Sequence, residues 1–149
     1  MAVAETHALD HLEPAGRIEA VDLAPRMIAE ARHKYPDPRV RFHVADAAAL
    51  PFDDASVDRV ICFSAWPHFP DPDAVVRQAA RVLVPGGRLH VWHIDSRHTI
   101  NDIHKNAGRA VQQDLLEPAE HLAARMQRQG LQVESTRDDH QAYEITATR

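Results

Sequence analysis

The sequence contains little of what several functional classes require: it has one cysteine, no long apolar run and no excess of basic residues. Cys62 alone cannot form an internal disulfide, which favours a reducing compartment such as the cytoplasm. No stretch approaches the roughly 18 consecutive apolar residues of a membrane span. The N-terminus carries Glu5, His7 and Asp10 where a signal peptide would be basic and then apolar. We therefore expect a cytoplasmic protein that has no membrane partner.

Basic residues and glycines are also scarce. The formal charge is −5, and the lysines and arginines are scattered, which argues against a nucleic-acid partner. The chain has 5 glycines, and none of them forms a Gly-x-Gly pair. The glycine-rich turn of dinucleotide-binding folds is therefore missing from the sequence.

The residues that are present are typical of one globular domain spanning 1–149. Apolar residues make up 44% and charged residues 26% of the 149 residues. Hydrophobic periodicity predicts helices alternating with strands. The expected helices are 2–13, 25–35, 71–83, 98–113 and 118–129, and the expected strands are 18–21, 40–44, 57–63, 89–94, 131–136 and 142–148.

This order predicts an α/β fold with a Rossmann-like, mostly parallel sheet and helices on both faces. The run Val60-Ile61-Cys62-Phe63 is apolar on both faces, which predicts a central, buried strand. The polar stretch 137–140 predicts a turn between the last two strands, so we expect the sheet to end in an antiparallel hairpin.

Polar residues follow three of the expected strands. Asp22 follows the first, Asp46 the second, and residues 64–68 the third. Because ligands of such sheets bind beyond the carboxyl ends of the strands, these positions are candidates for one binding crevice. A carboxylate at position 22 suits the two hydroxyls of a ribose. The alternative is an acid that only contacts backbone amides at a helix start.

Four segments together resemble the class I S-adenosylmethionine-dependent methyltransferases, of the small-molecule, methyltransferase type 11-like kind. IEAVDLAPRM at 18–27 resembles the acidic-loop motif of that family. VADA at 44–47, followed by LPF at 50–52, resembles the next motif, and SVDRV at 56–60 resembles the beginning of the following strand. LVPGGRL at 83–89 resembles the helix-to-strand turn before the fifth strand. The order and spacing agree over roughly residues 10–95.

The resemblance implies S-adenosylmethionine as the cofactor, methyl transfer as the reaction and a small molecule as the acceptor. Asp22 would hold the ribose hydroxyls, and Asp46 would accept a hydrogen bond from the adenine amino group. Ser64 would flank the methionine end of the cofactor. The cofactor-binding set that the resemblance implies is Asp22, Leu23, Met27, Asp46, Ala47 and Ser64.

The acceptor is expected near Trp66 and His68, and His68 is the candidate base if the acceptor must lose a proton. A packing role for this loop histidine is the alternative. Asn101 and His104 have helical spacing with His98 and could orient a polar substrate, although a solvated helix face has the same pattern. The histidines do not have the spacing of a metal site, so no metal is expected.

The missing glycine turn suggests that the domain is truncated at its N-terminus. By the resemblance, residues 2–13 correspond to the helix that follows this turn, and the usual first strand, which lies in the middle of the family's sheet, is missing. Its neighbours could pair directly, a second copy or another partner could complete the sheet, or the protein could be longer. A non-catalytic binding or oligomerisation module derived from the fold is therefore the alternative function.

Overall fold

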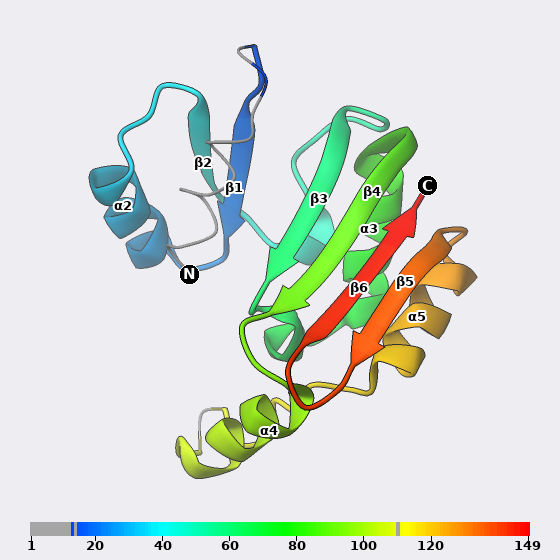
Figure 1. Ribbon diagram of the computed structural model, residues 1–149. Coiled ribbons are helices and arrows are strands. Elements are labelled where there is room, and N and C mark those ends of the chain that lie inside the picture. Colours follow the sequence, from blue (N-terminus) through cyan, green and yellow to red (C-terminus); the bar gives the residue numbers. More distant parts are fainter. Residues whose placement is uncertain (1–12, 14, 110) are drawn as a thin grey trace. The chain divides into compact units, whose positions relative to one another are not determined.

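The computed structural model describes residue 13, residues 15–109 and residues 111–149 (Figure 1). The expected helix at 2–13 therefore lies almost entirely outside the described residues. The chain divides into two compact units, residues 1–51 and residues 52–149, which are described separately below. Within the described residues, no helix is long and apolar enough to cross a membrane.

The first unit contains a two-stranded parallel sheet. Strand β1 (Ile18–Asp22) pairs with β2 (Val40–Val44), and helix α2 (Pro25–Lys34) connects them. The short 3-10 helix η1 (Ala47–Ala49) follows β2. These elements lie where the hydrophobic pattern predicts them.

A small core holds the first unit together. Ile28 of α2 packs with Val40 and Phe42 of β2, and all three are buried. Helix α2 begins where proline is favoured, with Pro25 at its first position, and it ends in a basic turn before Tyr35.

The second unit contains a four-stranded mixed sheet with the order β3-β4-β6-β5. Strands β3 (Val57–Phe63) and β4 (Leu83–His93) are parallel. Strands β5 (Gln132–Asp138) and β6 (Tyr143–Thr148) form the predicted antiparallel hairpin, and β6 also pairs with β4. The fold is thus α/β and Rossmann-like, with a C-terminal antiparallel hairpin.

Strand β3 differs from its prediction. Within the described residues it lies at one end of the four-stranded sheet and pairs only with β4. Ile61 is 44% exposed, although its neighbours in sequence are apolar. The prediction of a central, buried strand is therefore wrong for the described part of the chain, because an apolar run does not reveal whether both of its faces are covered.

Helices α3 (Pro72–Val82) and α5 (Ala119–Arg128) contact each other and cover the same sheet (Figure 1). The Asp71 carboxylate caps α3 by accepting a hydrogen bond from the Ala74 amide. The apolar faces of both helices are buried and form the core together with residues of the strands and of the loop before α5. The largest fully buried side chains of the described chain include Tyr143, Leu83, Leu89, Leu116, Leu122, Met126 and Ile145.

The turn between α3 and the parallel part of β4 depends on glycine. A Cβ at Gly87 would lie 2.9 Å from the Val84 carbonyl oxygen and 3.0 Å from that of Asp58. Two strands can approach this closely only where no side chain intervenes. The register of β3 on β4 shifts at this point, between Val57 and Arg59.

Two elements lie beyond the carboxyl ends of β3 and β4. The 3-10 helix η2 (Trp66–His68) follows β3, and α4 (Arg97–Asn106) follows β4, beyond its arrowhead in Figure 1. Helix α4 is shorter than the predicted helix 98–113, because Gly108 adopts a left-handed φ of +89°. The last hairpin turn also lies slightly later than predicted, since β5 continues to Asp138.

Candidate functional site

The carboxyl ends of β1 and β2 bring Asp22 and Asp46 into one region of the first unit. Asp22 pairs in register with Val44, and the Ala45 amide donates a hydrogen bond to the Asp22 carbonyl oxygen. Each aspartate accepts a hydrogen bond through Oδ1 from the backbone amide two residues later, Ala24 or Ala48, at 2.8 Å. The alternative prediction, an acid that contacts backbone amides near a helix start, therefore describes one oxygen of each carboxylate. Each carboxylate also keeps a second oxygen, Oδ2, with no hydrogen bond within the described chain.

Apolar side chains lie exposed beside these carboxylates. Leu23 is 70% and Met27 is 43% exposed. Ala47, the first residue of η1, is half-buried. A cavity of about 150 Å³ has Asp22 and Met27 in its lining.

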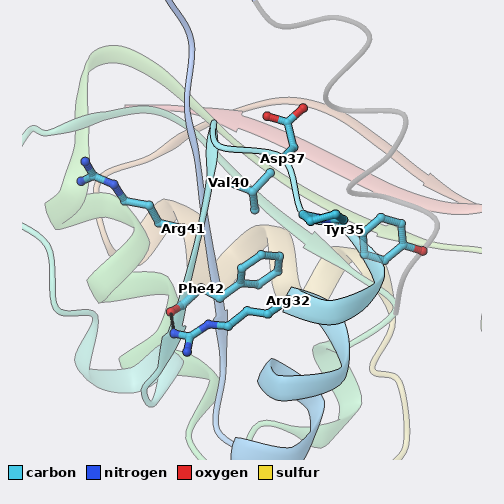
Figure 2. Close-up of a pocket in the computed structure, with 7 residues that line it drawn as sticks. Arg32, Tyr35, Asp37, Val40, Arg41 and Phe42 are labelled. Atoms are coloured by element: carbon cyan, nitrogen blue, oxygen red, sulfur yellow. Dashed lines mark hydrogen bonds between the residues drawn. The ribbon is translucent and has the colours of Figure 1, made fainter.

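A larger depression of about 470 Å³ lies at the opposite end of these strands, where β2 begins (Figure 2). Figure 2 shows Arg32 reaching the Phe42 carbonyl oxygen, at 2.6 Å, while Arg41 comes from the strand itself. This depression contains none of the predicted cofactor-binding residues. Size alone therefore does not locate the candidate site, and we place the site by its polar groups. The depression is lined by Arg32, Tyr35, Pro36, Asp37, Val40, Arg41 and Phe42.

Ser64 follows β3 in the second unit and has a left-handed backbone with φ of 50°. This conformation is strained for a residue other than glycine, and it is common where a backbone is shaped around a ligand. The Ser64 amide donates to the Trp92 carbonyl oxygen at 2.8 Å, and its hydroxyl accepts from the Ile94 amide at 3.3 Å. Contacts to both β4 and the loop after it therefore hold Ser64 in this conformation.

Trp66, a predicted substrate contact, is only 3% exposed. Its indole Nε1 donates a hydrogen bond to Glu117 Oε1 at 3.1 Å, and its ring meets Phe69 edge-on. Arg125 of α5 binds the same carboxylate at 3.1 Å. Trp66 thus ties the loop after β3 to the segment before α5, and its contact with a substrate stays a prediction.

His68 and His104 lie together. Their ring centroids are 5.0 Å apart, with an angle of 36° between the rings. His68 Nδ1 lies 2.8 Å from Asp114 Oδ2, and His104 Nδ1 contacts the carbonyl oxygen of the same Asp114. One residue of the loop after α4 therefore engages both histidines.

Asn101 fixes that loop. Its Nδ2 donates to the Leu116 carbonyl oxygen at 3.1 Å, and its Oδ1 accepts from the Leu116 amide at 2.7 Å. Both polar atoms of Asn101 are engaged in this way, so a contact with an acceptor stays a prediction. His98 does not join this group, because its ring stacks on His140 at 6.1 Å.

His93, at the end of β4, is 6% exposed, and neither of its ring nitrogens has a hydrogen-bond partner in the described chain. Burial, and to a smaller extent the nearby His68 and His104, lower its pKa to about 4. The Tyr143 ring meets His93 edge-on at 5.5 Å, and its hydroxyl is buried without a partner as well. Burial also raises the Tyr143 pKa. Both groups are therefore neutral near pH 7.

Other chemistry has little support in the described residues. Burial raises the pKa of the Cys62 thiol to about 12, so this cysteine is not a thiolate near neutrality. No group of three histidine, cysteine, aspartate or glutamate side chains in the described chain is arranged to hold a metal ion.

The sequence reasoning missed Asp114, His93 and Tyr143. The position of His93 at the end of a predicted strand next to an aspartate was a usable signal, because β4 ends beside η2 and α4. No local sequence pattern marks Asp114 as a candidate site residue. Its role depends on a loop that folds back on α4 through Asn101.

Comparisons with known proteins identify the family of the chain. The chain is 48% identical over 65 residues to methyltransferase GfsG of Streptomyces halstedii, across 44% of this chain and 23% of that protein. It is 57% identical over 53 residues to the 27-O-demethylrifamycin SV methyltransferase of Amycolatopsis mediterranei, across 36% of this chain and 20% of that protein. The chain thus matches only about a fifth to a quarter of the length of these relatives.

Among solved structures, a methyltransferase of Haloferax volcanii, in complex with the Trm112 methyltransferase activator, is similar in fold. Its TM-score is 0.81 at 20% identity, and the match covers 99% of this chain and 78% of that one. The sequence profile described as a methyltransferase domain matches residues 3–91. The chain therefore belongs to the methyltransferase domain family, and its resemblance to the class I S-adenosylmethionine-dependent enzymes is confirmed.

Proposed function

We propose that this protein transfers a methyl group from S-adenosylmethionine to a small-molecule acceptor. The observation that carries the proposal is the pair Asp22 and Asp46 at the ends of two parallel strands, each with one carboxylate oxygen that has no hydrogen bond within the described chain. Exposed Leu23 and Met27 beside them offer an apolar surface for a nucleobase. This set fits an adenosine group, which has ribose hydroxyls, an amino group and a flat apolar ring.

The roles follow from the chemistry of these side chains. Asp22 accepts hydrogen bonds from both ribose hydroxyls, and Asp46 accepts one from the adenine amino group. Leu23 and Met27 pack on the ring, and the Ala47 amide donates to a ring nitrogen. Ser64 holds the methionine end with its strained backbone. When bound, the cofactor supplies a methyl group that its sulfonium has already activated.

The residues proposed for the acceptor belong to the second unit. Trp66 and the segment held by Asn101 shape the approach, and His104 contacts the acceptor. His68 takes the proton if the acceptor must lose one. Two relatives support a small acceptor by their names, which specify 27-O-demethylrifamycin SV and demethylmenaquinone.

A role in partner binding is the second candidate function. Within the described residues β3 pairs on one side only, which favours this function because unpaired strand edges readily accept another strand. The Haloferax volcanii methyltransferase binds an activator, which supports a partner or a second copy completing the sheet here. Light scattering measures the oligomeric state and therefore tests this alternative. A folded monomer that binds no cofactor would support neither function.

Calorimetric titration with S-adenosylhomocysteine tests the main proposal. We expect the wild-type chain to bind and Asp22→Ala to lose at least about tenfold in affinity, equivalent to about 1.4 kcal/mol. Asp22→Asn retains an oxygen that can accept from the Ala24 amide but loses the charge, so it separates ligand binding from the loss of this backbone contact.

Asp37→Ala is a matched control. Asp37 also accepts a hydrogen bond from the amide two residues later, at 2.8 Å, but it lies at the opposite end of the strands. Equal binding by the wild type and Asp22→Ala, or equal weakening by Asp37→Ala, would contradict the proposed cofactor site.

A further inference from the structure

The loop after β3 is held at two places. At its start, Ser64 has a left-handed φ of 50°, donates its amide to the Trp92 carbonyl oxygen and accepts from the Ile94 amide. Two residues later, the buried Trp66 side chain donates its indole N–H to Glu117 Oε1 at 3.1 Å. A strained backbone persists only where its surroundings fix it from several sides, so the Trp66 contact helps to maintain the conformation of Ser64.

The position of Trp66 depends on Glu117. Within the described residues, the indole N–H has no hydrogen-bond partner other than this carboxylate. A buried N–H without a partner costs free energy, so removing the carboxylate would leave the ring unsatisfied or displace it. Phe69 meets the Trp66 ring edge-on, with the centroids 5.6 Å apart, but its side chain has no polar atom to accept the N–H. Glu117 is therefore the polar contact that fixes where Trp66 lies.

Charged neighbours hold the Glu117 carboxylate in turn. Arg125 of α5 donates from Nε to both oxygens of Glu117, at 3.1 Å each. Its Nη1 donates to Asp73 Oδ2, at the start of α3, at 2.5 Å. An arginine between two acids cannot turn without breaking charge-assisted hydrogen bonds. The carboxylate that accepts from Trp66 is thus tied to both helices that cover the four-stranded sheet.

The backbone on either side of Glu117 is fixed as well. Asn101 of α4 binds both the carbonyl oxygen and the amide of Leu116, at 3.1 and 2.7 Å. The Ala119 amide donates to Oδ2 of Asp138, at the end of β5, at 3.2 Å. The segment before α5 is therefore attached to several elements of the second unit, and the Glu117 side chain extends from this fixed segment to the loop after β3.

We propose that Glu117 is a positioning residue for the cofactor. By fixing Trp66, it holds the loop after β3 in the conformation in which Ser64 meets the methionine end of S-adenosylmethionine. The inference rests on the proposed function, because it explains how the Ser64 contact of that function is maintained. Glu117 acts through Trp66 and the loop, so it needs no contact of its own with the cofactor.

The first test uses the full chain without a ligand. Because the Ser64 amide donates to the Trp92 carbonyl oxygen at 2.8 Å, its hydrogen exchange, followed by NMR, reports how firmly the loop is held. Glu117→Ala should speed exchange at Ser64 at least about tenfold more than at Ile145, a buried residue of β6. A general loss of stability would speed exchange at both amides alike, so the ratio separates positioning from a merely structural role.

The second test is calorimetric titration with S-adenosylhomocysteine. Glu117→Ala should weaken binding at least about tenfold. Glu117→Gln should restore most of the affinity, since its amide oxygen still accepts from the Trp66 indole N–H. Trp66→Phe removes the same hydrogen bond from the other partner. The losses from Glu117→Ala and Trp66→Phe should therefore not add up in the double variant, because both substitutions break one contact.

Glu134→Ala is the matched control. Glu134 also accepts from one arginine Nε through both oxygens, since Arg88 lies 3.2 and 3.1 Å away, and it accepts from Thr148 as well. Its partners belong to β4 and β6, so the variant should leave both the affinity and the exchange at Ser64 as in the wild type. Equal weakening of binding by Glu134→Ala and Glu117→Ala, or additive losses in the double variant, would overturn the proposal.

Failure of this proposal is distinguishable from failure of the proposed function. Faster exchange at Ser64 in Glu117→Ala, with no binding of S-adenosylhomocysteine by the wild type, would support the positioning of the loop and reject its use for this cofactor. Binding by the wild type that Glu117→Ala leaves unchanged would retain the proposed function and reject the role of Glu117.

Discussion

The two compact units differ in how much of their stability they supply themselves. In its described residues, the first has two strands and a buried cluster of Ile28, Val40 and Phe42, and Leu23 and Met27 are exposed. The second has four strands, two helices on its sheet and many fully buried side chains. A two-stranded sheet is only marginally stable alone, whereas a four-stranded sheet covered by helices can sustain a core.

This difference suggests a division of roles. The proposed cofactor residues Asp22 and Asp46 belong to the weakly supported unit, where ligand binding adds a large share of stability. His68 and His104 belong to the well-packed unit, where Asn101 binds the backbone of the loop after α4 and Asp114 of that loop contacts both histidines.

The largest expected effect tests the difference between the cores. Leu122→Ala removes a fully buried side chain of α5 and should lower the free energy of unfolding by about 2–5 kcal/mol. Ile28→Ala should cost less in the same urea titration, because fewer neighbours surround it in the small core of the first unit. Equal losses of unfolding free energy from the two substitutions would contradict the difference between the two cores.

A second effect concerns pH. The His93 pKa falls from 6.5 to about 4 on folding, so the unfolded chain binds more protons between these values. Stability should therefore fall as pH drops from about 6.5 towards 4, by up to about 3 kcal/mol for this group, and the loss should end below that range.

The variant His93→Leu should lose this component of the pH dependence, as measured by urea unfolding at several pH values. His33→Leu, at an exposed histidine of the first unit, should retain it. If His93→Leu keeps the full acid sensitivity, the buried neutral state assigned to His93 is incorrect.

The smallest expected effect is a gain in the free energy of unfolding. Tyr143→Phe removes a buried hydroxyl that has no partner in the described chain, and should leave stability unchanged or raise it by up to about 1 kcal/mol. Tyr35→Phe, at a partly exposed ring of the first unit, should have no effect on the melting temperature. A clear loss of stability in Tyr143→Phe would show that the hydroxyl has a partner after all.

Much of the fold followed from the sequence, because local signals determine it. Proline at helix starts, glycine after helix ends and alternating apolar residues placed most of the strands and helices close to where they lie. The position of β3 did not follow, since Val60 to Phe63 has the same apolar pattern whether one or both strand edges are paired.

The candidate site was predictable only where it follows strand ends. Asp22, Asp46 and His68 follow the ends of β1, β2 and β3 as predicted, and their roles in a site stay predictions. Asp114 was not, because its contacts depend on a loop folding back over an irregular segment. Asn101 was assigned to the substrate by helical spacing, yet its amide is bound to the Leu116 backbone. Helical spacing predicts the face of the helix on which a residue lies, but not the group that its side chain contacts.

Hydrogen–deuterium exchange with and without S-adenosylhomocysteine tests the division of roles most directly. We predict that the ligand slows exchange in peptides from residues 18–50, which carry Asp22 and Asp46, and leaves residues 119–148 unchanged. Slowing confined to residues 119–148, or no slowing in residues 18–50, would contradict the account.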